Sequence, residues 1–245
     1  MRPLTFALAA EGPTDQAVIE NLLLGYFKDQ GLERDSIQWD QPKFIAKQTH
    51  DNQSHGNWEL LLEYLHVKDH REALETASYL VIQIDTDIVT NPKFGLDMKL
   101  AAAKSPDEIK KLVKGVRKRL AKEMGAEDYC YYRKRIFFAV CVHSMECWLL
   151  PLWNKGEETK DIKIQASTSN CLYKIEEALK KNKQPALVKY SSKKDKKEKK
   201  ILSSYQTASE KFREKNELEH AATKQTSLDL FCKRLGQIPL AAGLG

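Results

Sequence analysis

The sequence has few of the residues that build flexible linkers, with only 11 Gly and 8 Pro in 245 positions. No apolar run approaches the roughly 18 residues that a transmembrane helix needs, so we expect no membrane association. The five cysteines include no Cys-x-x-Cys pair, and their odd number and irregular spacing indicate neither a disulfide framework nor a zinc site. These absences favour a globular protein of the reducing cytoplasm.

The charge of the chain is unevenly distributed. The net charge is +6, yet residues 179–200 alone contain ten Lys and two acids, which leaves a net charge of −2 for the rest. A second block, residues 109–122, contains seven basic residues and no acid. One such block is often only a solvated surface, but two in an otherwise near-neutral chain indicate a polyanionic partner.

Apolar runs predict four short buried strands, at residues 3–10, 42–47, 78–85 and 135–144. Helical periodicity fills the intervals between them, and the capping box from Ser105 to Glu108 begins a helix that Gly125 ends. This alternation predicts an α/β fold with a mainly parallel four-stranded sheet covered by helices on both faces. We divide the chain into a unit at residues 1–155 and a helical extension with a Lys-rich loop at residues 156–245.

Carboxylates follow three of the four predicted strands. The first strand runs into Glu11 and Asp15, the third into Asp85 and Asp87, and the fourth into Glu146. Each acid alone could be a helix cap or a turn residue. Together they would gather at the carboxyl edge of a parallel sheet, where sites form and where a divalent cation would relieve their repulsion. Oxygen ligands without a His/Cys pattern indicate Mg²⁺ or Mn²⁺.

The order strand, Glu-Gly-x-Thr-Asp, helix, and then strand, Asp-x-Asp, resembles the Toprim domain. The form with Asp15 one turn into the helix is most similar to nucleases of the OLD (overcoming lysogenization defect) family. The segment from Ser144 to Leu150 also resembles small stand-alone Toprim-like proteins of bacterial phage-defence loci, some of which act beside a separate ABC-type ATPase. The resemblance covers roughly residues 4–150.

The resemblance implies a Mg²⁺-dependent endonuclease of DNA or RNA, the effector of an anti-phage system. Its catalytic residues would be Glu11, Asp85 and Asp87, with Asp15 and Glu146 as further metal ligands. The family also uses a lysine downstream of the acids, and several lysines of this chain compete for that place. No P-loop is present, so an ATPase would be a separate chain. The sequence does not decide whether the chain forms a homodimer.

The two basic blocks supply the candidate nucleic-acid contacts, which would position a backbone without reading its sequence. These are Lys193, Lys194, Lys196, Lys197, Lys199 and Lys200 in the first block, and Lys110, Lys114, Arg117 and Lys118 in the second. The alternative function is a catalytically silent Toprim-like subunit that binds nucleic acid or regulates an ATPase complex. The presence of all the acids favours the nuclease.

Overall fold

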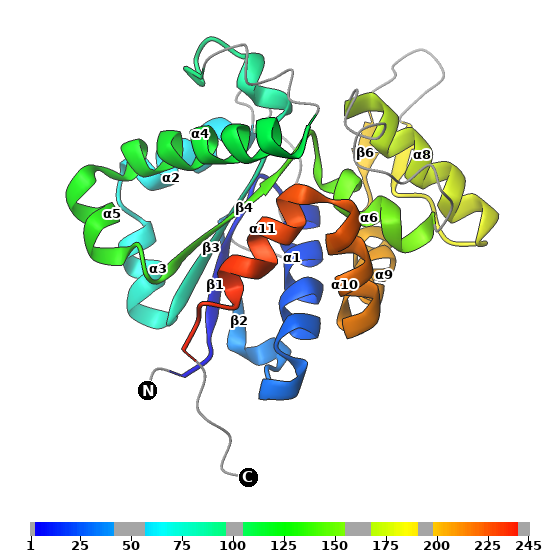
Figure 1. Ribbon diagram of the computed structural model, residues 1–245, viewed down its shortest axis with the longest axis horizontal. Helices are drawn as coiled ribbons and strands as arrows, with labels where there is room; N and C mark the ends of the chain where they lie inside the picture. The colour runs from blue at the N-terminus through cyan, green and yellow to red at the C-terminus, as the bar shows by residue number, and fades with distance from the viewer. Residues whose placement is uncertain (1–2, 42–56, 97–104, 155–167, 191–197, 240–245) are drawn as a thin grey trace.

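The computed structural model describes residues 3–41, 57–96, 105–154, 168–190 and 198–239. A four-stranded parallel sheet lies at its centre (Figure 1), with the strands in the order β2-β1-β3-β4. The strands are β1 (Phe6–Ala9), β2 (Ile37–Gln41), β3 (Tyr79–Asp85) and β4 (Ile136–Cys141). The predicted α/β fold with an all-parallel sheet is confirmed.

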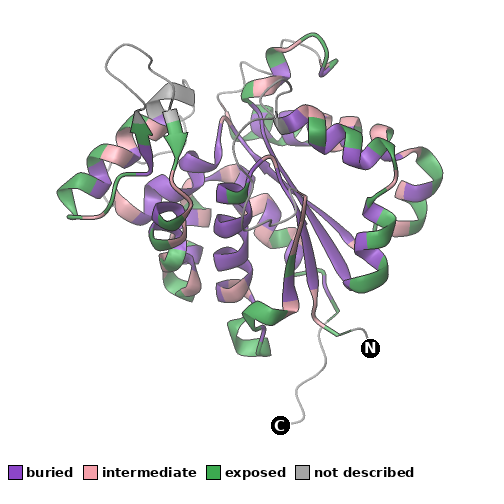
Figure 2. Cartoon of the chain, turned by 180° about the vertical axis from the view of Figure 1, so that it is seen from behind, coloured by how far each residue is buried: buried purple, intermediate pink, exposed green. Residues whose placement is uncertain are grey.

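Helices cover both faces of the sheet, because successive side chains of each strand point to opposite faces. On one face, Phe6 and Leu8 of β1 pack with α1 (Pro13–Tyr26). On the other, Ala7 and Ala9 belong to the core under α2 (Asn57–His66), α3 (His70–Thr76) and α4 (Pro106–Met124), and α5 (Ala126–Tyr132) follows α4. The strands β1, β3 and β4 are buried on both faces of the sheet (Figure 2), which explains their nearly continuous apolar sequences.

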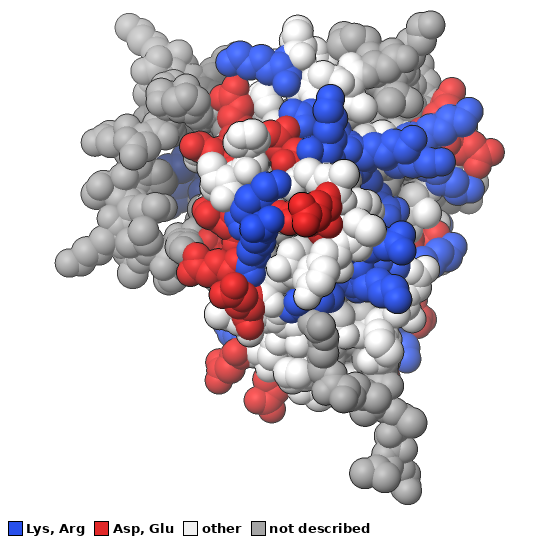
Figure 3. Space-filling model, turned by 90° about the vertical axis from the view of Figure 1, so that its left-hand side faces the viewer, with Lys and Arg blue, Asp and Glu red and all other residues white. Residues whose placement is uncertain are grey.

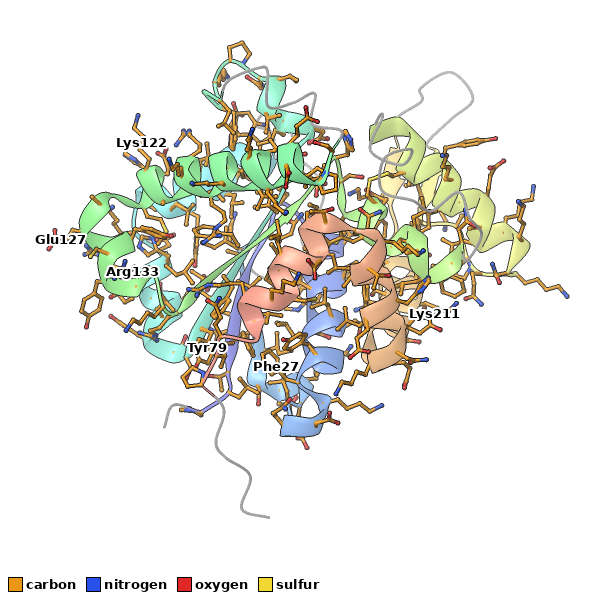
Figure 4. All side chains as sticks on the ribbon, in the orientation of Figure 1. Phe27, Tyr79, Lys122, Glu127, Arg133 and Lys211 are labelled. Carbon is orange, nitrogen blue, oxygen red and sulfur yellow. A yellow bond between two sulfur atoms is a disulfide. The ribbon has the colours of Figure 1, made fainter. Side chains whose placement is uncertain are left out.

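The face that α1 covers carries an aromatic group near the start of β1. The ring of Phe6 lies 5.4 Å from that of Phe27 and 5.5 Å from that of Tyr79, measured between centroids. Phe27 follows α1 and Tyr79 begins β3, so these contacts join the helix to the end of the sheet opposite its acids (Figure 4).

The C-terminal region is helical, as predicted. It contains α6 (Met145–Trp153), α8 (Thr168–Lys181), α9 (Leu202–Ser209), η6 (Glu210–Arg213), α10 (Lys215–Lys224) and α11 (Thr226–Leu235). These helices share one hydrophobic cluster with α1 and the sheet. Gly25 of α1 shows how closely they approach, because a Cβ there would lie 1.9 Å from the carbonyl oxygen of Phe212. The predicted boundary at residue 155 therefore separates segments that share a core.

Several local predictions differ from the structure. The second strand is residues 37–41, whereas the predicted strand at residues 42–47 lies outside the described residues. The alternation of apolar and polar residues from Ile37 to Trp39 is short, and polar residues follow it. For this reason the sequence analysis did not identify the edge strand. The Lys-rich segment was predicted to be a loop, but Glu198–Lys200 form β6, which pairs antiparallel with β5 (Val188–Tyr190).

Cys147 of α6 and Cys171 of α8 form a disulfide bond, which the cysteine spacing did not indicate. Both residues are fully buried between the two helices. Because disulfide bonds are rare in a reducing cytoplasm, this bond does not support the compartment predicted from the cysteine spacing. Among the described residues, no helix combines the length and the apolar character needed to cross a bilayer.

Candidate functional site at the carboxyl edge of the sheet

The strand order places a topological switch point between β1 and β3. The chain leaves β1 for β2 on one side and later returns to add β3 on the other. Open parallel sheets bind ligands just beyond the carboxyl ends of strands at such a point. Glu11 follows β1 and Asp85 ends β3, so two of the predicted catalytic acids lie at this position.

Hydrogen bonds join the ends of these two strands. The Glu11 Oε1 atom accepts a 2.7 Å bond from the backbone N–H of Asp85, and the Glu11 N–H donates to Gln83 Oε1 at 3.3 Å. The side-chain amide of Gln83 in turn donates to Asp85 Oδ1 at 2.9 Å. Both carboxylates are therefore oriented by neighbours on the rigid sheet rather than by a loop.

Asp15 and Glu146 reach the same place from the first turns of two helices. Gly12 in an extended conformation and Pro13 at the first helical position begin α1, and Asp15 is buried in its first turn. Ser144 begins α6 in the same way, and Glu146 is only 2% exposed. A helix N-terminus favours an anion, which helps both carboxylates to remain ionised.

Lys200 lies among these acids at the end of β6. Its Nζ atom is 3.0 Å from Glu146 Oε1 and 3.9 Å from Asp15 Oδ1. The hydroxyl of Tyr205, from α9, donates to the same Glu146 oxygen, and the ring of Tyr205 lies 5.4 Å from Lys200 Nζ. The extension thus supplies both a cation and a hydroxyl to acids of the first unit.

Asp87 lies at the rim of this group, beyond the end of β3, and its side chain is exposed. The turn that carries it is fixed to β4 by backbone bonds. The N–H groups of Thr86 and Asp87 both donate to the His143 carbonyl at 3.2 Å, and Thr86 Oγ1 accepts from the His143 N–H at 2.7 Å. We call Glu11, Asp15, Asp85, Asp87 and Glu146 the acid cluster.

Burial and mutual repulsion shift the pKa values in the acid cluster. Burial is the main reason that the pKa of Glu11 rises to about 8, and the charges of Asp15 and Asp87 add to it. Burial also raises the pKa of Asp15 to about 6 although Lys200 opposes the change. The pKa of Asp85 is raised well above its ordinary value by burial and by Glu11. Such shifts are typical of functional sites.

Glu146 behaves in the opposite way. Burial would raise its pKa, but the ammonium of Lys200 and the hydrogen bond from the Tyr205 hydroxyl oppose burial, and the pKa is lowered. The pKa of Lys200 is correspondingly raised by Asp15 and Glu146 against the effect of burial. Glu146 and Lys200 therefore form an ion pair within a group of acids whose pKa values are otherwise raised.

The donor chemistry of the acid cluster fits a hard divalent cation, since it consists of carboxylate oxygens. Asp15 Oδ1 is buried and receives no hydrogen bond. This carboxylate oxygen could therefore still accept a partner. As the side chains lie, however, no three acids, histidines or cysteines of the described residues are arranged as ligands of one ion. Lys200 occupies part of the space between Asp15 and Glu146.

The predicted nucleic-acid contacts are only partly described. Lys193, Lys194, Lys196 and Lys197 lie outside the described residues. Lys199 and Lys200 both keep exposed surface, but the Nζ atom of Lys200 contacts the acid cluster. On α4, Lys110, Lys114 and Lys118 are exposed, Lys110 pairs with Asp107 at 3.0 Å, and Arg117 is half-buried.

Sequence analysis did not identify Lys200 and Tyr205 as members of the site. Lys200 was one of six similar lysines in a run, and only the register of β6 distinguishes it. Tyr205 had no motif around it. Nothing in the sequence around either residue links it to Glu146.

Comparison with protein-family models, with curated proteins and with solved structures finds no match for the chain. The resemblance to the Toprim domain therefore rests on the sequence motifs alone.

Proposed function

We propose that this chain is a metal-dependent nuclease that hydrolyses phosphodiester bonds in DNA or RNA. The observation that carries the proposal is the acid cluster at the switch point, with one lysine beside it. Five carboxylates and one ammonium lie together at the carboxyl edge of a parallel sheet. Such an arrangement is suited to binding cations and phosphate together.

In this proposal, Glu11, Asp85 and Asp87 hold one Mg²⁺ or Mn²⁺, and Asp15 and Glu146 contribute to a second site. Bound divalent ions would supply charge stabilisation and an activated water. Glu11 has a pKa near neutrality, so it can accept or donate a proton at physiological pH. Lys200 takes the place of the downstream lysine of OLD-type nucleases, and its ammonium would move from Glu146 to the scissile phosphate.

The wider context of the proposal follows the resemblance. We place the nuclease in the bacterial cytoplasm, where nucleic acid is available, as the effector of an anti-phage system with a separate ABC-type ATPase. One observation favours the alternative of a silent binding or regulatory subunit. Lys200 already neutralises Glu146, and the acids are not arranged as ligands of a metal ion.

A cleavage assay separates the two functions. Single-stranded and duplex DNA and RNA are incubated with the wild type in Mg²⁺ or Mn²⁺, alone and with the product of the neighbouring gene. Glu11→Gln should abolish cleavage, whereas Glu127→Gln, which changes an exposed acid of α5, should not. Cleavage by Glu11→Gln within tenfold of the wild type would contradict the catalytic assignment. Absence of cleavage with metal and partner present would favour the silent subunit.

A further inference from the structure

Two arginines face the free edge of the sheet, away from the acid cluster. β4 is the outermost strand on its side, and α4 and α11 pack against it from opposite faces (Figure 1). The guanidinium of Arg117, on α4, lies 5.9 Å from the ring centre of Phe138, and that of Arg234, on α11, lies 5.3 Å from the ring centre of Phe137. Adjacent residues of a strand point to opposite faces, so the two arginines straddle its edge.

The two guanidinium groups line one cleft. A small hollow of about 20 Å³ is bounded by Arg117, Arg234, Ile136, Phe138 and residues of α11. The Arg135 carbonyl accepts from the Leu80 N–H at 2.9 Å, so residue 135 directs its carbonyl toward β3. Backbone groups of a parallel strand alternate between its two sides, so those of residues 136 and 138 face the free edge at this cleft.

Within the part of the chain that the structure describes, no acid pairs with these two arginines, whereas the neighbouring Lys233 pairs with Asp229 at 2.7 Å. Arg234 is held in place by acceptors, namely the Arg133 carbonyl at 2.9 Å and the side chain of Gln237. Burial, together with the charge of Arg117, lowers the pKa of Arg234. Two partly buried cations that repel each other and have spare N–H donors form a receptor for an anion.

The surrounding surface carries further positive charge. Lys114, Lys118 and Lys122 of α4 are exposed, as are Arg133 and Lys134 before β4. Lys122 lies near the end of α4 and Arg133 directly after α5, on the same side of the molecule (Figure 4). Seen from the α5 end of the molecule, Lys and Arg gather along one side of the surface (Figure 3). A polyanion, rather than a single small anion, would satisfy a surface of this extent.

We propose that Arg117 and Arg234 form a phosphate clamp that holds the backbone of the nucleic acid at the free edge of β4. This inference rests on the proposed function, because it concerns the path of that substrate. The hollow is too small for a phosphate, so the phosphate lies at its mouth between the two guanidinium groups. The planar donors of arginine fit phosphate oxygens in pairs.

The clamp also predicts a minimum length for a tightly bound strand. Asp85 of the acid cluster pairs with Cys141 at the end of β4, and Phe138 comes three residues earlier. Three residues of a β-strand span about 10 Å. A nucleic acid that contacts both the acid cluster and the arginine clamp must therefore extend several nucleotides beyond the acid cluster. Longer oligonucleotides should therefore gain affinity from the clamp, and very short ones should not.

The test measures binding without metal, so it does not depend on cleavage. Fluorescence anisotropy follows labelled single-stranded and duplex DNA with the wild type and with Arg117→Gln plus Arg234→Gln over a range of salt concentrations. Loss of two phosphate contacts should reduce the slope of log affinity against log salt by about 1.4 for single strands and 1.8 for duplex. The control Lys28→Gln plus Lys215→Gln removes the same charge from exposed residues near the far end of α1 and should leave the slope nearly unchanged.

Length and folding controls make the outcome decisive. With strands of about 4, 8 and 16 nucleotides, the loss in the double variant should grow with length. Both arginines pack on aromatic rings, so replacing them with Gln could affect folding. The variant Arg117→Lys plus Arg234→Lys keeps the charge, and it should recover only part of the affinity that the Gln variant loses. An unchanged slope in a folded double variant, or no binding by the wild type at low salt, would overturn the clamp. Binding through the clamp without cleavage in metal would instead overturn the nuclease.

Discussion

The raised pKa of Glu11 makes a measurable prediction about stability in the absence of metal. In the folded protein this pKa is about 8 against an ordinary value of 4.5, so the folded state binds a proton that the unfolded state has lost. Stability is therefore highest below pH 4.5 as far as this group is concerned, and it falls as the pH rises from 4.5 to 8. Above pH 8 the loss is complete.

The size of the effect follows from the two pKa values. At about 1.4 kcal/mol per pH unit, the rise from 4.5 to about 8 corresponds to about 5 kcal/mol as an upper bound. Asp15 acts in the same direction over a narrower window, from 3.8 to about 6. The two carboxyls interact, so their contributions do not simply add. A loss of 3–5 kcal/mol in a chain of this length lowers the Tm by roughly 10 °C.

Glu11→Gln isolates this contribution, because glutamine keeps an oxygen that can accept from the Asp85 N–H but cannot ionise. Thermal unfolding is followed by circular dichroism between pH 5 and 9 in EDTA for the wild type, Glu11→Gln and the exposed control Glu127→Gln. The Tm of the wild type and of the control should fall more steeply than that of Glu11→Gln. Parallel curves for all three proteins would refute the reasoning that burial holds a proton on Glu11.

The remaining predictions concern other parts of the site and its support. Mg²⁺ or Mn²⁺ should raise the Tm of the wild type, most strongly near pH 8, and Asp85→Asn plus Asp87→Asn should lose that shift; an equal shift in the variant would move the metal elsewhere. Lys200→Met should cost roughly 1–3 kcal/mol in urea unfolding, because Glu146 loses its cation, and full stability would show that the ion pair is dispensable. Trp148→Ala should cost about 3–5 kcal/mol, because the fully buried indole packs on Phe231, and a loss below 1 kcal/mol would contradict that packing.

The parts of the fold that could be predicted were those with a strong local signal. β3 and β4 are apolar runs buried on both faces, and α4 begins at the predicted capping box, where the Ser105 side chain accepts from Glu108 and Glu108 accepts from Ser105. β2 escaped prediction because it is an edge strand with only its first residue buried. At an edge, tertiary pairing decides the conformation more than the sequence does.

The same distinction applies to the site. Glu11, Asp15, Asp85 and Glu146 could be predicted to lie together, because each follows a strong strand and parallel strands end at one edge. Lys200 could not, because its place depends on β6, which pairs with β5 and lies more than 50 residues after Glu146 in the sequence. A long-range contact of this kind leaves no periodic trace in the chain.

The acid cluster is balanced in the structure by two different kinds of positive charge. Lys200 neutralises Glu146, the one acid whose pKa is lowered, while Glu11 and Asp85 are neutralised by protons that their raised pKa values retain. A divalent cation that displaced those protons would bind best where the protons are held least, above neutral pH. In the proposed nuclease, the lysine would only need to turn from Glu146 toward a phosphate. Separate groups would then exchange a proton with a metal ion and receive the substrate.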